Sequence, residues 1–203
     1  MRIALCNEVI APMPFPKPCE YAAKLGYDGL EIAPYTLSDE PHRLGAAQLA
    51  AAMARAQESF AAVAERAQKA GVIYCIEPLS SDQTPLINTL EEAAALVTAI
   101  GNPSVRTMLD CSSAGRMETA PLPALVDTWL PKGMIAHVQV NDRNRRGPGQ
   151  GEQRFAPLFA ALVRHGYAGD IAVEPFDYVP DGPGAAARAI GYIKGILEAL
   201  QER

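Results

Sequence analysis

The sequence predicts a parallel α/β fold made of β/α repeats, with six strands and six helices. Short apolar segments of strand length alternate with longer segments that have helical periodicity. The short segments are almost continuously apolar, as are strands covered by helices on both faces of a sheet. The chain has 203 residues, which is enough for one domain with a sizeable core. We therefore expect a single domain over residues 1–203.

The six predicted strands are short, and several are rich in β-branched residues. They cover residues 2–9, 29–33, 72–78, 105–110, 135–140 and 170–174. Five helices are predicted from their periodicity and their start and stop signals, such as Thr89 as an N-cap and Gly101 after the last turn. These helices cover residues 15–25, 90–100, 122–130, 155–165 and 185–200.

The remaining segment, residues 46–70, is rich in alanine and contains neither glycine nor proline. As one helix it would be about 37 Å long, at roughly 1.5 Å per residue. That is longer than one β/α unit usually needs. The sequence leaves open whether it is a single long helix or two helices that meet without a strand between them.

Carboxylates stand at the ends of several predicted strands, at Glu8, Glu77, Asp110, Asp142 and Glu174. In parallel β/α folds, the carboxyl ends of the strands meet at one face, where active sites lie. Carboxylates gathered there would repel each other unless a divalent cation lay between them. Oxygen ligands suit Mg²⁺ or Mn²⁺, although any single polar strand end is equally explained by a solvated loop.

The loop at residues 141–151 follows a predicted strand and combines Asn141 and Asp142 with three arginines and three glycines. Arginine in such a loop suits a substrate that carries hydroxyl, carboxylate or phosphate groups. The alternative is a solvated loop without a role in binding. His137, on the preceding strand, is expected to point the same way as Gln139 because side chains alternate along a strand.

Composition excludes several classes of protein. The net charge is −5, and the one short basic run is residues 143–146, so a nucleic-acid surface is not expected. No segment is long enough to span a membrane, and the first residues lack the pattern of a signal peptide. We expect a cytoplasmic protein without a membrane partner. Its four cysteines form no CxxC pair and are expected to be buried free thiols.

With these residues in place, the chain resembles the xylose isomerase-like TIM-barrel superfamily. Within it, the sequence is most similar to the sugar phosphate isomerase/epimerase group, which includes ketose 3-epimerases and hydroxypyruvate isomerases. The resemblance covers nearly the whole chain. It rests on Asp110 and on the segments CNEV at 6–9, LGYDGLEIAP at 25–34, YCIEPL at 74–79, HVQVNDRNRRGPGQG at 137–151 and GYAGDIAVEPFDY at 166–178.

The resemblance implies a site for one divalent ion, Mn²⁺ or Mg²⁺, held by Glu77, Asp110, Gln139 and Glu174. It also implies that Glu77 and Glu174 transfer protons on opposite faces of a small sugar, sugar phosphate or hydroxy-keto acid through an enediolate. The protein would then be an isomerase or epimerase of carbohydrate metabolism. The residues expected to contact the carbohydrate-like substrate are Glu8, His137, Asn141, Asp142 and Arg145.

The sequence also departs from that family. Gln139 stands where epimerases have a histidine ligand, Ser113 where a substrate-contacting histidine is common, and Gln83 where a further glutamate is placed. A typical barrel has eight units and about 250 residues. Here the third and fourth units are partly missing, with a deletion expected near residues 50–56, so the barrel is TIM-barrel-like but shortened to six strands. Open strand edges would remain, which a second copy of the chain could cover.

Two other functions remain open at this point. The shortened barrel could be catalytically impaired and act as a binding or interaction protein. Alternatively, the fold could belong to a DNA repair enzyme that resembles endonuclease IV. Those enzymes hold a zinc cluster with several histidines, whereas this acidic chain has three histidines in total.

Overall fold

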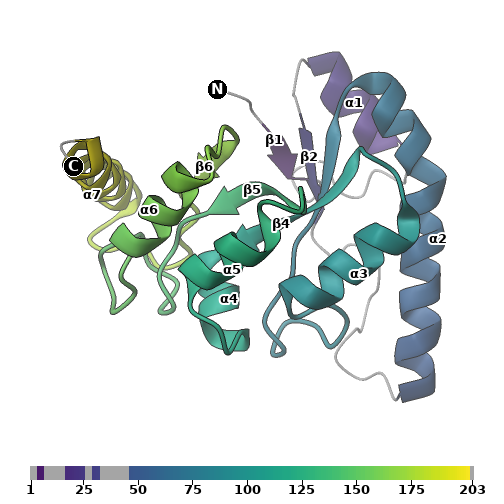
Figure 1. Cartoon of the computed structure of the whole chain (residues 1–203), viewed down its shortest axis with the longest axis horizontal. Helices are drawn as coiled ribbons and strands as arrows, with labels where there is room; N and C mark the ends of the chain where they lie inside the picture. Colours follow the sequence, from purple (N-terminus) through teal and green to yellow (C-terminus); the bar gives the residue numbers. More distant parts are fainter. Residues whose placement is uncertain (1–3, 7–16, 26–28, 33–45, 202–203) are drawn as a thin grey trace. The chain divides into compact units, whose positions relative to one another are not determined.

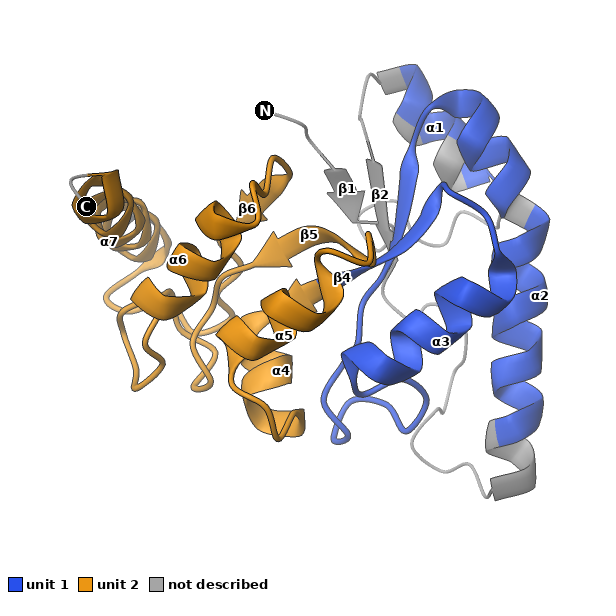
Figure 2. Ribbon diagram, viewed as in Figure 1, with its two compact units in different colours: residues 1–108 blue, residues 109–203 orange. Residues whose placement is uncertain are grey.

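A computed structural model describes residues 4–6, 17–25, 29–32 and 46–201 of the chain. The chain divides into two compact units, Met1–Met108 and Leu109–Arg203 (Figure 2). The boundary lies within a strand, four residues from its start. The prediction of one domain over residues 1–203, with a deletion near residues 50–56, stays a prediction.

Unit 1 contains parallel strands, as the sequence predicts. They are β1 (Ala4–Cys6), β2 (Gly29–Ile32), β3 (Ile73–Ile76) and the first part of β4 (Val105–Asp110). Each strand pairs in parallel with the next one along the chain. Between β3 and β4 the register aligns Ile76 with Thr107, whose hydroxyl donates a hydrogen bond to the carbonyl oxygen of Ile76 at 2.7 Å.

The helices of unit 1 are α1 (Lys17–Leu25), α2 (Ala46–Ala70) and α3 (Leu90–Ile100) (Figure 1). The alanine-rich segment is one continuous helix of 25 residues, which decides between the two alternatives left open by its sequence. It contacts α1, α3 and β3. Its buried side chains include Phe60, which packs edge-on against Tyr74 of β3 with ring centroids 5.7 Å apart.

The boundaries of α3 follow the signals read from the sequence. The Thr89 hydroxyl accepts a hydrogen bond from the backbone N–H of Glu92, while the Glu92 carboxylate accepts one from the N–H of Thr89. This capping box satisfies backbone donors that the first turn of a helix leaves without partners. At the other end Gly101 adopts the left-handed conformation, with φ of 68°. Both predictions are confirmed.

Unit 2 contains the end of β4 and the remaining elements (Figure 1). These are α4 (Cys111–Met117), α5 (Leu122–Trp129), β5 (Ile135–Gln139), α6 (Ala156–Arg164), β6 (Asp170–Ala172) and α7 (Gly182–Gln201). Strands β5 and β6 are parallel. Helix α4 was not predicted, so the described part of the chain has one helix more than the six that the sequence indicates.

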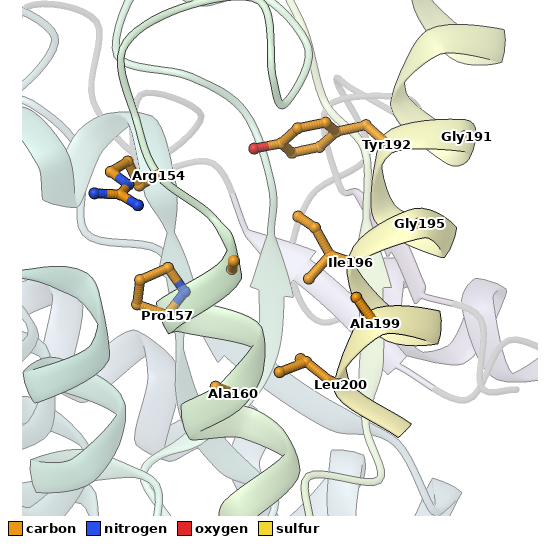
Figure 3. A pocket seen from close by; sticks show the side chains of 10 residues that line it. Arg154, Pro157, Ala160, Gly191, Tyr192, Gly195, Ile196, Ala199 and Leu200 are labelled. Atoms are coloured by element: carbon orange, nitrogen blue, oxygen red, sulfur yellow. The ribbon is translucent and has the colours of Figure 1, made fainter. Parts of the chain in front are cut away.

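The core of unit 2 lies where α5 and α6 meet. Leu125 and Val126 of α5 and Leu158 and Phe159 of α6 are all buried. A pocket of about 620 Å³ lies between α6 and α7 (Figure 3). Small residues on α7, among them Gly195, leave this space between the two helices.

Two of the four cysteines lie among residues whose side chains are described. Cys75 and Cys111 are both buried free thiols, as expected. Burial, followed by the charges of Asp110 and Asp142, raises the pKa of the Cys111 thiol well above its usual range. This thiol is therefore protonated at neutral pH. No helix in the described ranges combines the length and apolar character needed to cross a membrane.

Asp127 on α5 accepts hydrogen bonds from Arg164 and His165 at the end of α6. These contacts, that of Arg164 first, lower the pKa of the Asp127 carboxyl in the folded protein. A lowered carboxyl pKa adds stability above the pKa of the unfolded chain, and this contribution is lost as pH falls through the folded value. We expect Asp127→Asn to lower the urea midpoint at pH 7 and to have a smaller effect at about pH 3, below the usual aspartate value.

Glu198→Gln, which changes an exposed carboxylate on α7, is the matched control and is expected to leave the urea midpoint unchanged at both pH values. Equal losses for Asp127→Asn at pH 7 and pH 3 would show that the effect is not electrostatic.

Candidate metal centre

Asp110 occupies two structural positions at once, because it is the last residue of β4 and the N-cap of α4. Its Oδ1 accepts a hydrogen bond from the backbone N–H of Ser113 at 2.6 Å. The side chain is 4% exposed, and Oδ2 has no hydrogen-bond partner among the residues that the structure describes. A buried carboxylate oxygen without a partner is costly unless it ligates a cation or takes up a proton.

The pKa of Asp110 reflects this balance. Burial raises it, while the hydrogen bond from Ser113 and the nearby polar groups of Asn141 and Ser112 act in the opposite direction. The pKa of Asp110 is raised overall, which means that burial outweighs the effect of these polar groups when no cation is bound. A cation bound at Oδ2 would favour the charged form.

Asn141 connects the two ends of this site. The residue is fully buried and lies two residues beyond the end of β5. Its Oδ1 accepts from the backbone N–H of Ser112 at 3.0 Å, and its Nδ2 donates to the backbone carbonyl of Glu174 at 3.0 Å. One side chain therefore holds the first turn of α4 and the segment that follows β6.

Asp110 and Glu174 are brought together by these connections. Each offers a carboxylate oxygen, and the two oxygens lie within 4.8 Å of each other. A divalent cation with oxygen ligands at roughly 2.0 to 2.6 Å can bind both. Glu174 is half-buried two residues beyond the last residue of β6. The pair is therefore spaced for a shared cation.

Gln139 ends β5 and is 1% exposed. It pairs with Ala172 of β6, and the next backbone N–H, that of Val140, donates to the Ala172 carbonyl at 2.8 Å. This register places Gln139 on the strand beside the one that leads into Glu174. His137 lies two residues earlier, paired with Asp170, and burial lowers its pKa while Asp170 opposes that change. At about 3.3 Å per residue, His137 is further from the carboxyl end of the strand.

Glu77, in unit 1, directly follows β3 and is 9% exposed. Since Ile76 pairs with Thr107, continuing the register aligns Glu77 with Met108 of β4. Met108 precedes Asp110 by two residues along the chain. Glu8, which we expect to contact the substrate, lies outside the described residues.

Asp142 stabilises the conformation of the loop that follows β5. Its Oδ1 accepts from the backbone N–H of Arg143 at 2.9 Å and of Gln153 at 3.4 Å. Its own backbone N–H donates to the carbonyl of Arg146 at 2.8 Å. The side chain is 1% exposed, and a Cβ at Gly151 would collide with its Oδ1. This structural role was not predicted, although aspartate commonly bonds to nearby backbone in turns.

Arg145 lies on the same loop and is exposed, with its backbone in the left-handed region at φ of 67°. Within unit 2, the structure thus brings Asp110 and Glu174 together through Asn141 and places Gln139 on the adjoining strand. The roles of His137, Asn141, Asp142 and Arg145 in substrate binding stay predictions.

Comparison with known proteins identifies the family of this fold. Residues 19–196 match the family model described as xylose isomerase-like TIM barrel. The chain belongs to this family. The parallel strands of the described residues are those of a shortened TIM-barrel-like fold.

Its relatives include sugar epimerases. The D-psicose 3-epimerase of Ruminiclostridium cellulolyticum is 30% identical over 122 residues, which is 60% of this chain and 41% of that protein. The L-ribulose 3-epimerase of Mesorhizobium japonicum is 30% identical over 122 residues, which is 60% of this chain and 40% of that one. The chain thus spans about two-fifths of the length of these curated relatives.

Solved structures give the same result for the fold. A D-psicose 3-epimerase crystallised in the presence of D-fructose matches with a TM-score of 0.71 at 26% identity, covering 81% of this chain and 55% of that one. An L-ribulose 3-epimerase matches with a TM-score of 0.73 at 21% identity, covering 92% of this chain and 66% of that one, and it supports the fold alone.

The close approach of Gly151 to Asp142 gives a test of the loop. We expect Gly151→Ala to lower the free energy of unfolding by about 1 to 3 kcal/mol, the usual cost of overpacking, because the new methyl group would collide with the carboxylate. Urea denaturation measures this change.

Gly195→Ala is the matched control, because nothing lies within 4 Å of its would-be Cβ and the residue is inside α7. It is expected to raise stability by about 0.5 to 1 kcal/mol, as alanine does in place of glycine within helices. Equal effects of the two substitutions would refute the packing of Asp142 on Gly151.

Proposed function

We propose that the protein is a divalent-metal-dependent isomerase or epimerase of a small sugar, sugar phosphate or hydroxy-keto acid. The observation that carries the proposal is that carboxylate oxygens of Asp110 and Glu174 lie within 4.8 Å of each other. The Asp110 Oδ2 is also buried and has no hydrogen-bond partner among the described residues. Membership of the family and the epimerases among its relatives support the same class of reaction.

The residues that would hold the metal are Glu77, Asp110, Gln139 and Glu174. The register of β3 with β4 supports the inclusion of Glu77, because it aligns this residue with the strand that ends in Asp110. The oxygen-only ligand set favours Mn²⁺ or Mg²⁺. Gln139 would contribute a neutral amide oxygen, so we expect weaker binding than with a charged or imidazole ligand in its place.

When bound, the metal ion would polarise the carbonyl of the substrate and so acidify the neighbouring C–H group. Of the two glutamates, one removes this proton to give an enediolate and the other returns a proton from the opposite face. Return to the same carbon inverts its configuration, whereas return to the former carbonyl carbon moves the carbonyl. Arg145 would bind a hydroxyl or anionic group of the substrate and orient it.

A second candidate function is a binding protein without catalysis. It is favoured by Gln139, which places a neutral amide at one of the four proposed ligand positions. A homo-oligomer that covers exposed strand edges fits either function, and light scattering measures that state.

Metal binding tests the ligand set directly. By titration calorimetry with Mn²⁺, we expect one ion per chain, with affinity at least about tenfold lower in Asp110→Asn, Glu77→Gln and Glu174→Gln, since even indirect partners of a metal contribute that much. Gln139→His should bind Mn²⁺ more tightly. Glu198→Gln is the control. A protein that binds no Mn²⁺, or is indifferent to all of these changes, would exclude the proposed site.

Proton transfer distinguishes the enzyme from the binding protein. Incubation with ketoses and Mn²⁺ in D₂O should place deuterium on the carbon next to the carbonyl, as NMR detects, because the removed proton exchanges with solvent. Glu77→Gln and Glu174→Gln should each abolish this incorporation. Binding of Mn²⁺ and sugar without any exchange would favour the non-catalytic function.

A further inference from the structure

We propose that Phe176 is a positioning residue that fixes the Arg145 guanidinium in the orientation needed to bind the substrate. This inference rests on the proposed function, since it concerns the same substrate. Its starting observation is that the Arg145 guanidinium carbon lies over the Phe176 ring, 4.5 Å from the ring centroid. Phe176 is 51% exposed, so its ring is available for such a contact at the surface.

The backbone of Arg145 is held by hydrogen bonds on both sides. Its N–H donates to the carbonyl of Asp142 at 2.8 Å. Its carbonyl accepts from the N–H groups of Phe176 at 2.8 Å and Asp177 at 3.0 Å. A positive φ is uncommon for a residue with a side chain and persists where surrounding contacts impose it. These three hydrogen bonds are such contacts.

The guanidinium of Arg145 differs from that of the next residue, Arg146, which pairs with Asp177 at 2.7 Å. For Arg145, the described part of the chain supplies neither a carboxylate nor a hydrogen-bond acceptor to the guanidinium. Stacking on an aromatic ring occupies the face of the guanidinium and leaves its in-plane N–H donors available. Arg145 is therefore oriented without its donors being used.

The same short segment carries Glu174 and Phe176. The Asn141 amide holds the carbonyl of Glu174, and the Arg145 carbonyl holds the N–H groups of Phe176 and Asp177. The position of the Arg145 guanidinium is thus tied to that of Glu174 through a few backbone bonds. An arginine held in this way suits a hydroxyl, carboxylate or phosphate group on a substrate that also reaches Glu174.

The test compares Phe176→Leu, which removes the ring, with Phe176→Tyr, which keeps it. Steady-state kinetics on a converted ketose should show KM raised about two- to fivefold in Phe176→Leu, as expected for loss of an exposed cation–π contact, with kcat changed much less. Phe176→Tyr should remain near wild type. Mn²⁺ affinity should be the same in all three proteins.

Tyr178→Leu is the matched control, because Tyr178 is an exposed aromatic residue of the same segment, at 57% exposure. It should change none of these quantities. A fall in kcat with KM unchanged, or equal effects of Phe176→Leu and Tyr178→Leu, would overturn the positioning role.

A readout independent of activity is the NMR signal of the Arg145 Nε–H. The ring of Phe176 should shift this signal in the wild type, and the shift should vanish in Phe176→Leu. An absent shift overturns the proposal. Should no ketose be converted, the proposed function fails separately. Titration with inorganic phosphate and with glycerate, followed by the NMR signal of the Arg145 Nε–H, then tests the inference. If the ligand shifts this signal in the wild type and shifts it less in Phe176→Leu, the inference is supported. If the signal does not change in the wild type, the inference is refuted.

Discussion

The candidate site depends on two hydrogen bonds made by the side chain of Asn141. One end of its amide accepts from the N–H of Ser112, and the other end donates to the carbonyl of Glu174. Only an amide supplies both an acceptor and a donor in a side chain of this length, so aspartate could not make both bonds in its charged form. Because Asn141 is fully buried, losing either bond would leave a polar group without a partner in the interior.

The consequences of this connection extend in both directions along the chain. Towards α4, it stabilises the turn in which Asp110 caps the helix with one oxygen and keeps the other available to a cation. Towards β6, it sets the backbone from which the Glu174 side chain extends. The next residue, Asp142, stabilises the loop that carries Arg145. Residues 141–145 thus help to position two carboxylates, those of Asp110 and Glu174, and the side chain of Arg145.

Electrostatics explains why such a site needs a cation. Burial raises the pKa of Asp110 despite the hydrogen bond from Ser113 and the nearby polar groups of Asn141 and Ser112. A second carboxylate within 4.8 Å adds repulsion to this cost when both are charged. A divalent ion between them offsets both effects. The same reasoning led from the sequence to a metal site, and unit 2 supplies the geometry for two of its four proposed ligands.

Much of this could be predicted from the sequence where the signals are local. The N-cap at Thr89, the left-handed Gly101 and the parallel strands depend on neighbouring residues and on periodicity. The sequence left open whether residues 46–70 form one helix or two, and the structure has one. Helix α4 was missed because its serines and glycine favour helices weakly, and it begins through the capping oxygen of Asp110. The loop role of Asp142 and the contact of Arg145 with Phe176 depend on backbone angles and distant residues, which no local pattern reveals.

The most direct test of the metal centre is an anomalous difference map from crystals grown with Mn²⁺ and measured at the manganese absorption edge. We expect a single strong peak per chain, bonded to the Asp110 Oδ2 and to oxygens of Glu174, Gln139 and Glu77. No peak at these residues, or a peak whose ligands exclude Asp110 and Glu174, would contradict this expectation.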